Sequence, residues 1–141
     1  MPVVVTGADS PLGAAVVAAL CSDPLVEVRA TVRRREAVRA LAAQGAVVAV
    51  SDLADPRRAG AVLEGAHTVV HLDPAPLDHV LEAADGTSVR RLVLVLPAAT
   101  TEASVSAAAA EIGIEAEFVT GSAAVADAGV VAAVLEADRR R

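Results

Sequence analysis

The chain has 141 residues, a net charge of −6 and 55% hydrophobic residues. This length predicts one domain with a sizeable core, over residues 1–141. No apolar run reaches the ~18 residues of a membrane-spanning helix, and the scattered arginines exclude an obvious nucleic-acid surface. With one cysteine, Cys21, and no evident signal peptide, we expect a cytoplasmic protein without disulfides.

Short apolar runs rich in β-branched residues alternate with helical patterns along the whole chain. The runs predict strands at 2–6, 26–32, 46–50, 67–72, 91–96 and 115–120. The helical patterns cover 12–20, 36–44, 56–64, 77–84, 101–112 and about 124–138. This alternation predicts an α/β, Rossmann-like fold, which is a three-layer αβα sandwich around a doubly wound parallel sheet. The expected strand order is 3-2-1-4-5-6, with ligands at the carboxyl ends of the strands.

The first strand and helix are joined by the turn GADSPLG, which runs from Gly7 to Gly13. Unpaired N–H groups and the helix dipole make such a turn a phosphate site, as in dinucleotide-binding proteins. Gly7 permits a sharp exit from the strand, and Gly13 permits close helix packing. Ser10 or Pro11 replaces the usual middle glycine, and the Ser10 hydroxyl can donate to phosphate. We expect a dinucleotide at Gly7, Ser10, Pro11, Leu12 and Gly13; a turn without ligand is the alternative.

Three segments follow patterns known from one superfamily: VVVTGADSPLG, GAVVAVSDLADPRRAGAVLEGAHTVVHL and VLEAADGTSVRRLVLV. They resemble the TGxxGxxG opening, the stretch from third to fourth strand, and the next helix and strand of the short-chain dehydrogenase/reductase superfamily. The similarity is greatest to its extended and atypical branches, the NAD-dependent epimerase/dehydratase and NmrA-like families. The resemblance covers nearly the whole chain and implies an NAD(P) cofactor. It places Asp52 and Leu53 beside the adenine, and Leu72 at the cofactor.

The chain departs from this superfamily where the family's chemistry is concentrated. The family uses a Tyr-x-x-x-Lys pair, and this sequence contains neither tyrosine nor lysine. The serine or threonine usual after the fifth strand is replaced by Leu96-Pro97, and the family's substrate-binding segments have no counterpart. We therefore expect a non-catalytic or regulatory dinucleotide binder and assign no catalytic residue. The alternatives are an oxidoreductase or nucleotide-sugar epimerase-like enzyme with a non-standard acid, and a structural module without nucleotide.

Charged residues near the expected cofactor suggest which dinucleotide binds. Arg33 and Arg34 follow the second strand, where the adenosine ribose is expected. Guanidinium groups match the 2′-phosphate of NADP, so NADP is expected, with NAD as the alternative. A solvated start of the next helix is the other interpretation of these arginines. Asp9 would repel a pyrophosphate if it pointed inward, so we expect it to face solvent.

The histidines and two helices raise further possibilities. His71 ends the fourth predicted strand near the cleft, and it is the one titratable side chain that could replace the family's acid. An ordinary strand-end histidine is the alternative. His67 lies about 13 Å from His71 along an extended chain, too far to share an ion, so no metal site is predicted.

Extended family members pair through the helices after strands four and five, which implies a homodimer through 77–84 and 101–112.

Overall fold

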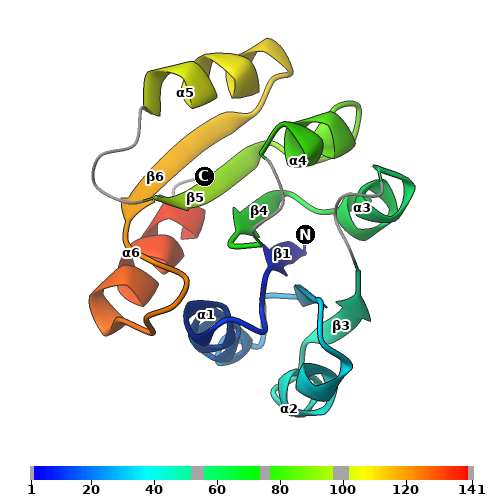
Figure 1. Ribbon diagram of the computed structural model, residues 1–141, viewed down its shortest axis with the longest axis vertical. Coiled ribbons are helices and arrows are strands. Elements are labelled where there is room, and N and C mark those ends of the chain that lie inside the picture. Colours follow the sequence, from blue (N-terminus) through cyan, green and yellow to red (C-terminus); the bar gives the residue numbers. More distant parts are fainter. Residues whose placement is uncertain (1, 52–55, 74–76, 97–101, 140–141) are drawn as a thin grey trace.

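The computed structural model describes residues 2–51, 56–73, 77–96 and 102–139, with the backbone alone at residues 56 and 102–104. The strands in this part of the chain form one parallel sheet, in the order β3-β2-β1-β4-β5-β6 (Figure 1). They are β1 (Val3–Thr6), β2 (Val28–Val32), β3 (Val47–Val50), β4 (Thr68–His71), β5 (Arg91–Leu96) and β6 (Glu115–Thr120). The predicted fold class and strand order are confirmed.

Helices cover both faces of this sheet, as Figure 1 shows. They are α1 (Pro11–Cys21), α2 (Val38–Ala43), α3 (Pro56–Leu63), α4 (Leu77–Ala84), α5 (Glu102–Glu111) and α6 (Ala128–Arg139). A 3₁₀ turn, η1 (Arg35–Ala37), precedes α2, so the helix predicted at 36–44 begins with a tighter turn. Core residues from α1, α2 and α6 lie in one hydrophobic cluster, and those from α3, α4 and α5 lie in another.

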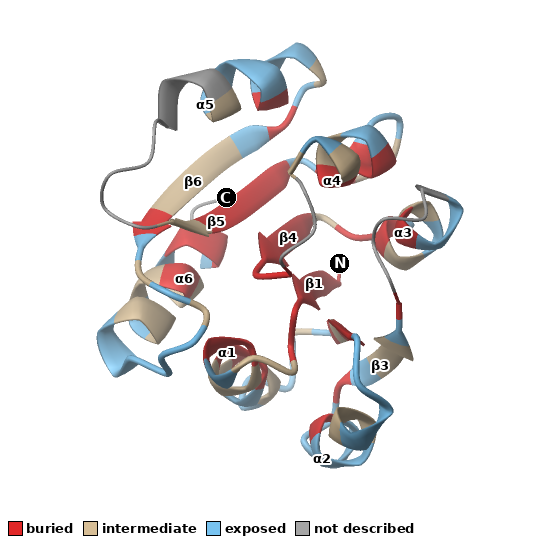
Figure 2. Cartoon of the chain, viewed as in Figure 1, coloured by how far each residue is buried: buried red, intermediate tan, exposed pale blue. Residues whose placement is uncertain are grey.

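The first strand is central to the sheet and explains the uniform apolar run at the start of the sequence. β1 pairs with β2 on one side and with β4 on the other. All of its residues are buried, as the red central strands in Figure 2 show. Val3 and Val5 belong to the cluster under α1, whereas Val4 belongs to the cluster on the opposite face. A strand covered on both faces has no polar face, so the sequence shows no alternation.

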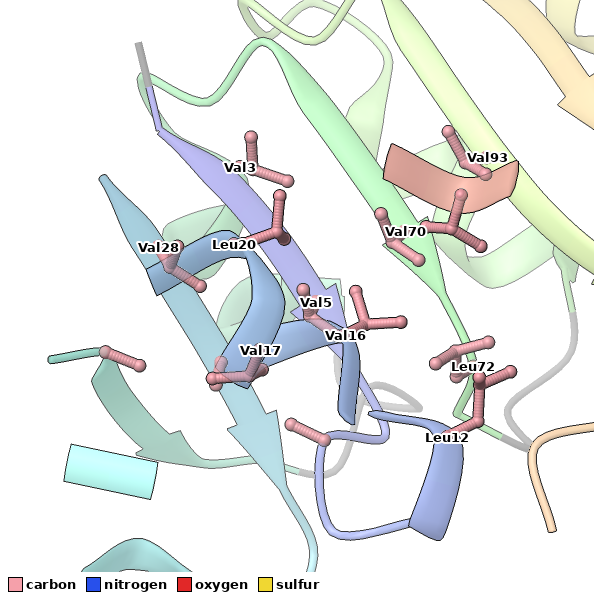
Figure 3. Packing of buried hydrophobic residues seen from close by; sticks show 14 of the residues in the cluster. Val3, Val5, Leu12, Val16, Val17, Leu20, Val28, Val70, Leu72 and Val93 are labelled. Atoms are coloured by element: carbon pink, nitrogen blue, oxygen red, sulfur yellow. The ribbon is translucent and has the colours of Figure 1, made fainter. Parts of the chain in front are cut away.

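Helix α1 is held on the sheet by apolar side chains at helical spacing. The buried ones are Leu12, Val16, Val17 and Leu20. Figure 3 shows these side chains turned toward those of Val3, Val5 and Val70. Leu12 and Leu72 lie at the same end of the cluster, next to the turn that follows β1. This packing fixes the start of α1 relative to the carboxyl ends of β1 and β4.

A buried arginine joins the end of α6 to the sheet. Arg91, at the start of β5, has only 5% of its surface exposed. Its guanidinium donates to the carbonyl oxygens of Ala137 (2.8 Å) and Asp138 (3.4 Å) near the end of α6. It also forms an ion pair with Glu115 of β6 at 3.3 Å. Carbonyls in the last turn of a helix lie beyond the reach of its i+4 amides, and Arg91 supplies donors to two of them in a buried position.

Three expectations from the sequence concern membrane-spanning helices, the pairing of chains and the reactivity of Cys21. No helix in the described ranges is long and apolar enough to cross a membrane. Ala109 of α5 and Val80 of α4 are buried against the sheet, and pairing of chains through these two helices stays a prediction. Burial raises the pKa of the Cys21 thiol, so less of it is the reactive thiolate at neutral pH.

Candidate nucleotide-binding site

The carboxyl ends of β1 and β4 form the point where the strand order of the sheet reverses. From β1 the chain continues to β2 and β3 on one side, and β4 leads to β5 and β6 on the other. The helices that follow the two strands, α1 and α4, therefore diverge to opposite faces and leave a crevice at this point. Ligands in open α/β sheets bind in such crevices.

Gly7 forms the floor of this crevice and brings the two strand ends together. Its φ is +62°, a left-handed conformation that favours glycine. A Cβ at Gly7 would lie 2.7 Å from the carbonyl carbon of Leu72 and 2.7 Å from the amide nitrogen of Asp73. No side chain fits between these backbones, so both the conformation and the close approach require glycine.

Gly13 makes a second close approach, between helix α1 and the turn before it. A Cβ at Gly13 would lie 2.4 Å from the carbonyl oxygen of Gly7 and 2.7 Å from Cα of Ala8. At Gly13 the helix therefore packs against the backbone of the turn, whereas the sequence led us to expect close packing of Gly13 on the sheet. This stacking holds the first turn of α1 close to the end of β1.

Ser10 caps α1. Its Oγ accepts a hydrogen bond from the amide of Gly13 (3.1 Å) and donates to the carbonyl oxygen of Gly7 (2.7 Å). The backbone amide of Ser10 also donates to Gly7, at 3.0 Å. In this conformation the hydroxyl proton of Ser10 is directed into the turn. The Ser10 hydroxyl can donate to a phosphate oxygen only if it gives up its hydrogen bond to the carbonyl oxygen of Gly7.

The backbone N–H group of Leu12, in the first turn of α1, also has a hydrogen-bond partner. Pro11 has no N–H, and the amide of Leu12 donates to the carbonyl oxygen of Ala123 at 3.1 Å. Ala123 belongs to the loop between β6 and α6, and its side chain packs against the core under α1. The chain itself thus occupies the donor that a pyrophosphate would use at this helix end.

Asp9 does not face solvent, so that expectation is wrong. Its side chain is 13% exposed, and Oδ2 accepts from the amides of Arg33 (3.0 Å) and Arg34 (3.2 Å). The Arg34 guanidinium lies 3.6 Å from the same oxygen and donates to the Asp9 carbonyl at 2.9 Å. Two backbone amides at the end of β2 donate to the carboxylate and hold it away from solvent, because hydrogen bonds to a charged acceptor are strong. Asp9 therefore ties the turn to β2.

Arg33 reaches across the crevice to the end of β4. Its Nε lies 3.0 Å from Oδ2 of Asp73 and its NH2 lies 2.8 Å from Oδ1, a two-point ion pair. The Asp73 side chain is 2% exposed, whereas that of Arg33 is 42% exposed. Nothing in the local sequence around either residue indicates this contact, because only the packing of β1 between β2 and β4 brings the two together.

His71 lies on the other side of the crevice. It is 8% exposed, and its Nδ1 lies 2.8 Å from Oγ1 of Thr6. The same Thr6 oxygen accepts from the amides of Leu72 (2.9 Å) and Asp73 (3.2 Å). His71 and Leu72 line a cavity of about 220 Å³ with residues of β5 and with Ala123. The sequence therefore located His71 correctly beside the crevice, although it did not indicate the role of Thr6.

Two hydroxyl groups near the ends of β2 and β3 have no hydrogen-bond partner among the residues that the structure describes. They belong to Thr31, which is fully buried, and to Ser51, which is 4% exposed. Ser51 follows β3 directly, and its amide donates to the carbonyl of Val32. The predicted adenine contacts, Asp52 and Leu53, come next in the chain and lie outside the described residues. Buried hydroxyls normally find partners, so this part of the crevice has unused hydrogen-bonding capacity.

No family model matches the sequence, and no curated protein matches it either. Solved structures do match its fold. Triphenylmethane reductase from Citrobacter sp., complexed with NADP(H), aligns with a TM-score of 0.66 and 23% identity, over 84% of this chain and 48% of that one. The NADPH-dependent quinone oxidoreductase of Escherichia coli gives a TM-score of 0.66 and 25% identity, over 82% of this chain and 46% of that one.

A nucleoside-diphosphate-sugar epimerase from Staphylococcus aureus aligns with a TM-score of 0.68 and 17% identity, over 85% of this chain and 50% of that one. The chain has the Rossmann fold of these reductases and epimerases. The resemblance found in the sequence is thus confirmed at the level of the fold. The chain spans about half the length of these three proteins.

Proposed function

We propose that this chain binds NADP(H) in the crevice at the carboxyl ends of β1, β2 and β4. The main support is the stacking of Gly13 on Gly7 at the point where the sheet order reverses. Only glycine fits at either position, and the arrangement brings the start of α1 against the backbone of the turn. A helix N-terminus over a glycine turn suits a pyrophosphate, because the backbone can approach it closely.

Other features favour a nucleotide, and specifically one with a 2′-phosphate. Arg33 and Arg34 stand at the end of β2, where the adenosine ribose of such a cofactor lies. The hydroxyl of Ser51, which has no hydrogen-bond partner within the described part of the chain and follows β3 directly, offers a hydrogen bond to the adenosine half. Asp52, Leu53 and Leu72 complete the proposed set of contacts by their likeness to the family. The named neighbours include an NADPH-dependent enzyme and a complex with NADP(H), which supports the same cofactor.

Binding requires one rearrangement of the chain. The pyrophosphate needs the Leu12 amide, which now donates to Ala123. The loop from Gly121 to Asp127 carries that carbonyl, and most of its residues are exposed. Moving the loop breaks this hydrogen bond and the contact of Ala123 with the core, and the charge of a pyrophosphate at the helix N-terminus favours the exchange. The Leu12 amide then becomes a phosphate ligand, and the Ser10 hydroxyl joins it by exchanging its hydrogen bond to Gly7 for one to the phosphate.

We further propose that the 141-residue chain is a non-catalytic or regulatory dinucleotide binder. When bound, the cofactor supplies a hydride, and reduction of a carbonyl also needs a positioned acid. The family's tyrosine and lysine are absent from the sequence. An oxidoreductase with a non-standard acid is the second candidate, because His71 lines a cavity in the crevice.

Calorimetric titration with NADPH and with NADH tests the binding proposal. We expect saturable binding of NADPH and weaker binding of NADH. In Gly13→Val, the side chain collides with Gly7 and Ala8, so affinity is lost and unfolding free energy falls by about 1–3 kcal/mol. The matched control is Gly60→Ala in α3, where a Cβ meets no atom within 4 Å. Failure of the wild type to bind either dinucleotide would remove the proposed function.

A further inference from the structure

Arg33 and Asp73 form the strongest charge contact that the described residues place at the crevice. The guanidinium donates two hydrogen bonds to the carboxylate, one from Nε to Oδ2 at 3.0 Å and one from NH2 to Oδ1 at 2.8 Å. Two-point arginine–carboxylate pairs are strong and set the orientation of both groups. The pair spans the ends of β2 and β4, above the turn at Gly7. It therefore lies where the adenosine half of the proposed cofactor would rest.

The carboxylate of this pair cannot follow the arginine if the arginine moves. The amide of Asp73 donates to Oγ1 of Thr6 at 3.2 Å, and the backbone at Gly7 leaves no space beside it. The Asp73 side chain is 2% exposed. Withdrawal of the guanidinium would leave a buried negative charge without this cation, which is strongly unfavourable. Arg33 is thus held in place by the burial of its partner.

Arg34 is in a different situation. Its guanidinium is 68% exposed, lies 3.6 Å from the Asp9 carboxylate and donates to the Asp9 carbonyl oxygen at 2.9 Å, and both contacts are at the surface. Exposed pairs of this kind contribute little to stability. Moreover, Asp9 stays hydrogen-bonded to the amides of Arg33 and Arg34 when the guanidinium turns away. Arg34 can therefore move to a phosphate at little cost.

We propose that Asp73 is a cofactor-selectivity residue, which withholds Arg33 from the 2′-phosphate so that Arg34 alone recognises it. This inference rests on the proposed binding of NADP(H). Its consequence is a preference for NADPH that is smaller than two free arginines would give. Removal of the Asp73 charge frees Arg33 for the phosphate and sharpens the preference. Asp73 acts through Arg33 and not by touching the cofactor.

The test is the ratio of NADH to NADPH dissociation constants, measured by calorimetry. Arg34→Ala is expected to lower the ratio about tenfold, the loss of one charge-assisted contact. Asp73→Asn is expected to raise it about tenfold, and the added change Arg33→Met should abolish that gain. The double variant carries no charge at either position, so it does not bury an unpaired carboxylate. Arg35→Ala is the control, because Arg35 is exposed in the next turn.

A direct measurement avoids the folding problem of single substitutions at Arg33. Titration of the wild type with 2′,5′-ADP, followed by NMR at the Arg33 Nε–H group, should leave that signal unchanged. The corresponding Arg34 signal should shift. A shift at Arg33, or an unchanged ratio in Asp73→Asn, would overturn the inference while the proposed function stands. Absence of binding in every variant would overturn both. Equal wild-type affinities for NADPH and NADH would also overturn the inference, because Arg34 would then not recognise the 2′-phosphate.

Discussion

The amide of Leu12 donates a hydrogen bond to the carbonyl oxygen of Ala123, 3.1 Å away. One group starts the first helix, and the other lies in the loop that leads to the last helix. The contact is therefore a tertiary one, and it closes the crevice at the point where a pyrophosphate would bind. Because Ala123 also lines the cavity beside His71, movement of this loop would open both parts of the crevice together.

We expect Ala123→Gly to speed NADPH association. The substitution removes the methyl group that packs on the core and gives the loop more freedom, which disfavours its closed position by about 0.5–1 kcal/mol. The expected gain is about two- to fivefold in the association rate, measured by stopped-flow fluorescence of NADPH. Ala124→Gly is the control, since Ala124 is exposed beside it. A complex that keeps the Leu12–Ala123 hydrogen bond would contradict this prediction.

Thr6 is predicted to hold the end of β4 in place. Its Oγ1 accepts from two amides, those of Leu72 and Asp73, and lies beside Nδ1 of His71. Thr6→Val keeps the shape of the side chain but leaves these buried donors without their acceptor. The expected loss is about 1–3 kcal/mol in unfolding free energy, measured by urea denaturation. Thr6→Ser keeps the hydroxyl, and a loss as large as that of the valine variant would show that the hydroxyl is unimportant.

Arg91 is predicted to anchor the end of α6. Arg91→Met fills similar space but removes the donors to Ala137 and Asp138, so we expect a loss of about 2–3 kcal/mol. Hydrogen exchange should accelerate at the end of α6 before it does in β1. Arg90→Ala, a change at the exposed neighbour, should alter stability by less than about 0.5 kcal/mol. Equal effects of the two substitutions would show that burial of Arg91 is not what stabilises the helix.

The sequence was most informative where local chemistry decides the structure. The apolar run of β5 was predicted at its observed bounds, Arg91–Leu96, because a strand buried in a parallel sheet has a continuous apolar sequence. The start of α6 was placed about four residues too early. The side chain of Asp127 accepts from the amides of Gly129 (2.8 Å) and Val130 (3.2 Å) and caps this helix. The Asp-x-Gly pattern was the signal that could have located it.

From the sequence, the candidate site was predictable only in the course of its backbone and not in its side-chain contacts. The glycine turn and the position of the arginines after β2 follow from spacing along the chain. The bonds from Arg33 to Asp73 and from Leu12 to Ala123 join segments that are far apart in sequence. Such contacts depend on how the strands and loops pack, and no periodicity encodes them. The same holds for Asp9, whose expected exposure to solvent did not take into account the backbone amides of Arg33 and Arg34 that donate to its side chain.

The last prediction concerns catalysis by the 141-residue chain. Hydride transfer to a carbonyl leaves negative charge on its oxygen, which a positioned acid must neutralise. The sequence has no tyrosine and no lysine, and loss of such an acid typically costs about 10²–10⁴-fold in rate. We therefore expect little or no NADPH oxidation with quinones, aldehydes or ketones. The one histidine at the crevice, His71, is 8% exposed and lies against Thr6.

The decisive comparison is between the wild type, His71→Ala and His79→Ala. His79 lies on α4 outside the crevice cavity, so its substitution controls for the loss of an imidazole. All three proteins should show the same low rate, because His71 is held by the fold and no acid is positioned for a substrate. Robust turnover in the wild type and in His79→Ala, with loss in His71→Ala, would make His71 the acid. The chain would then be an oxidoreductase that replaces the family's tyrosine by an imidazole from the end of β4.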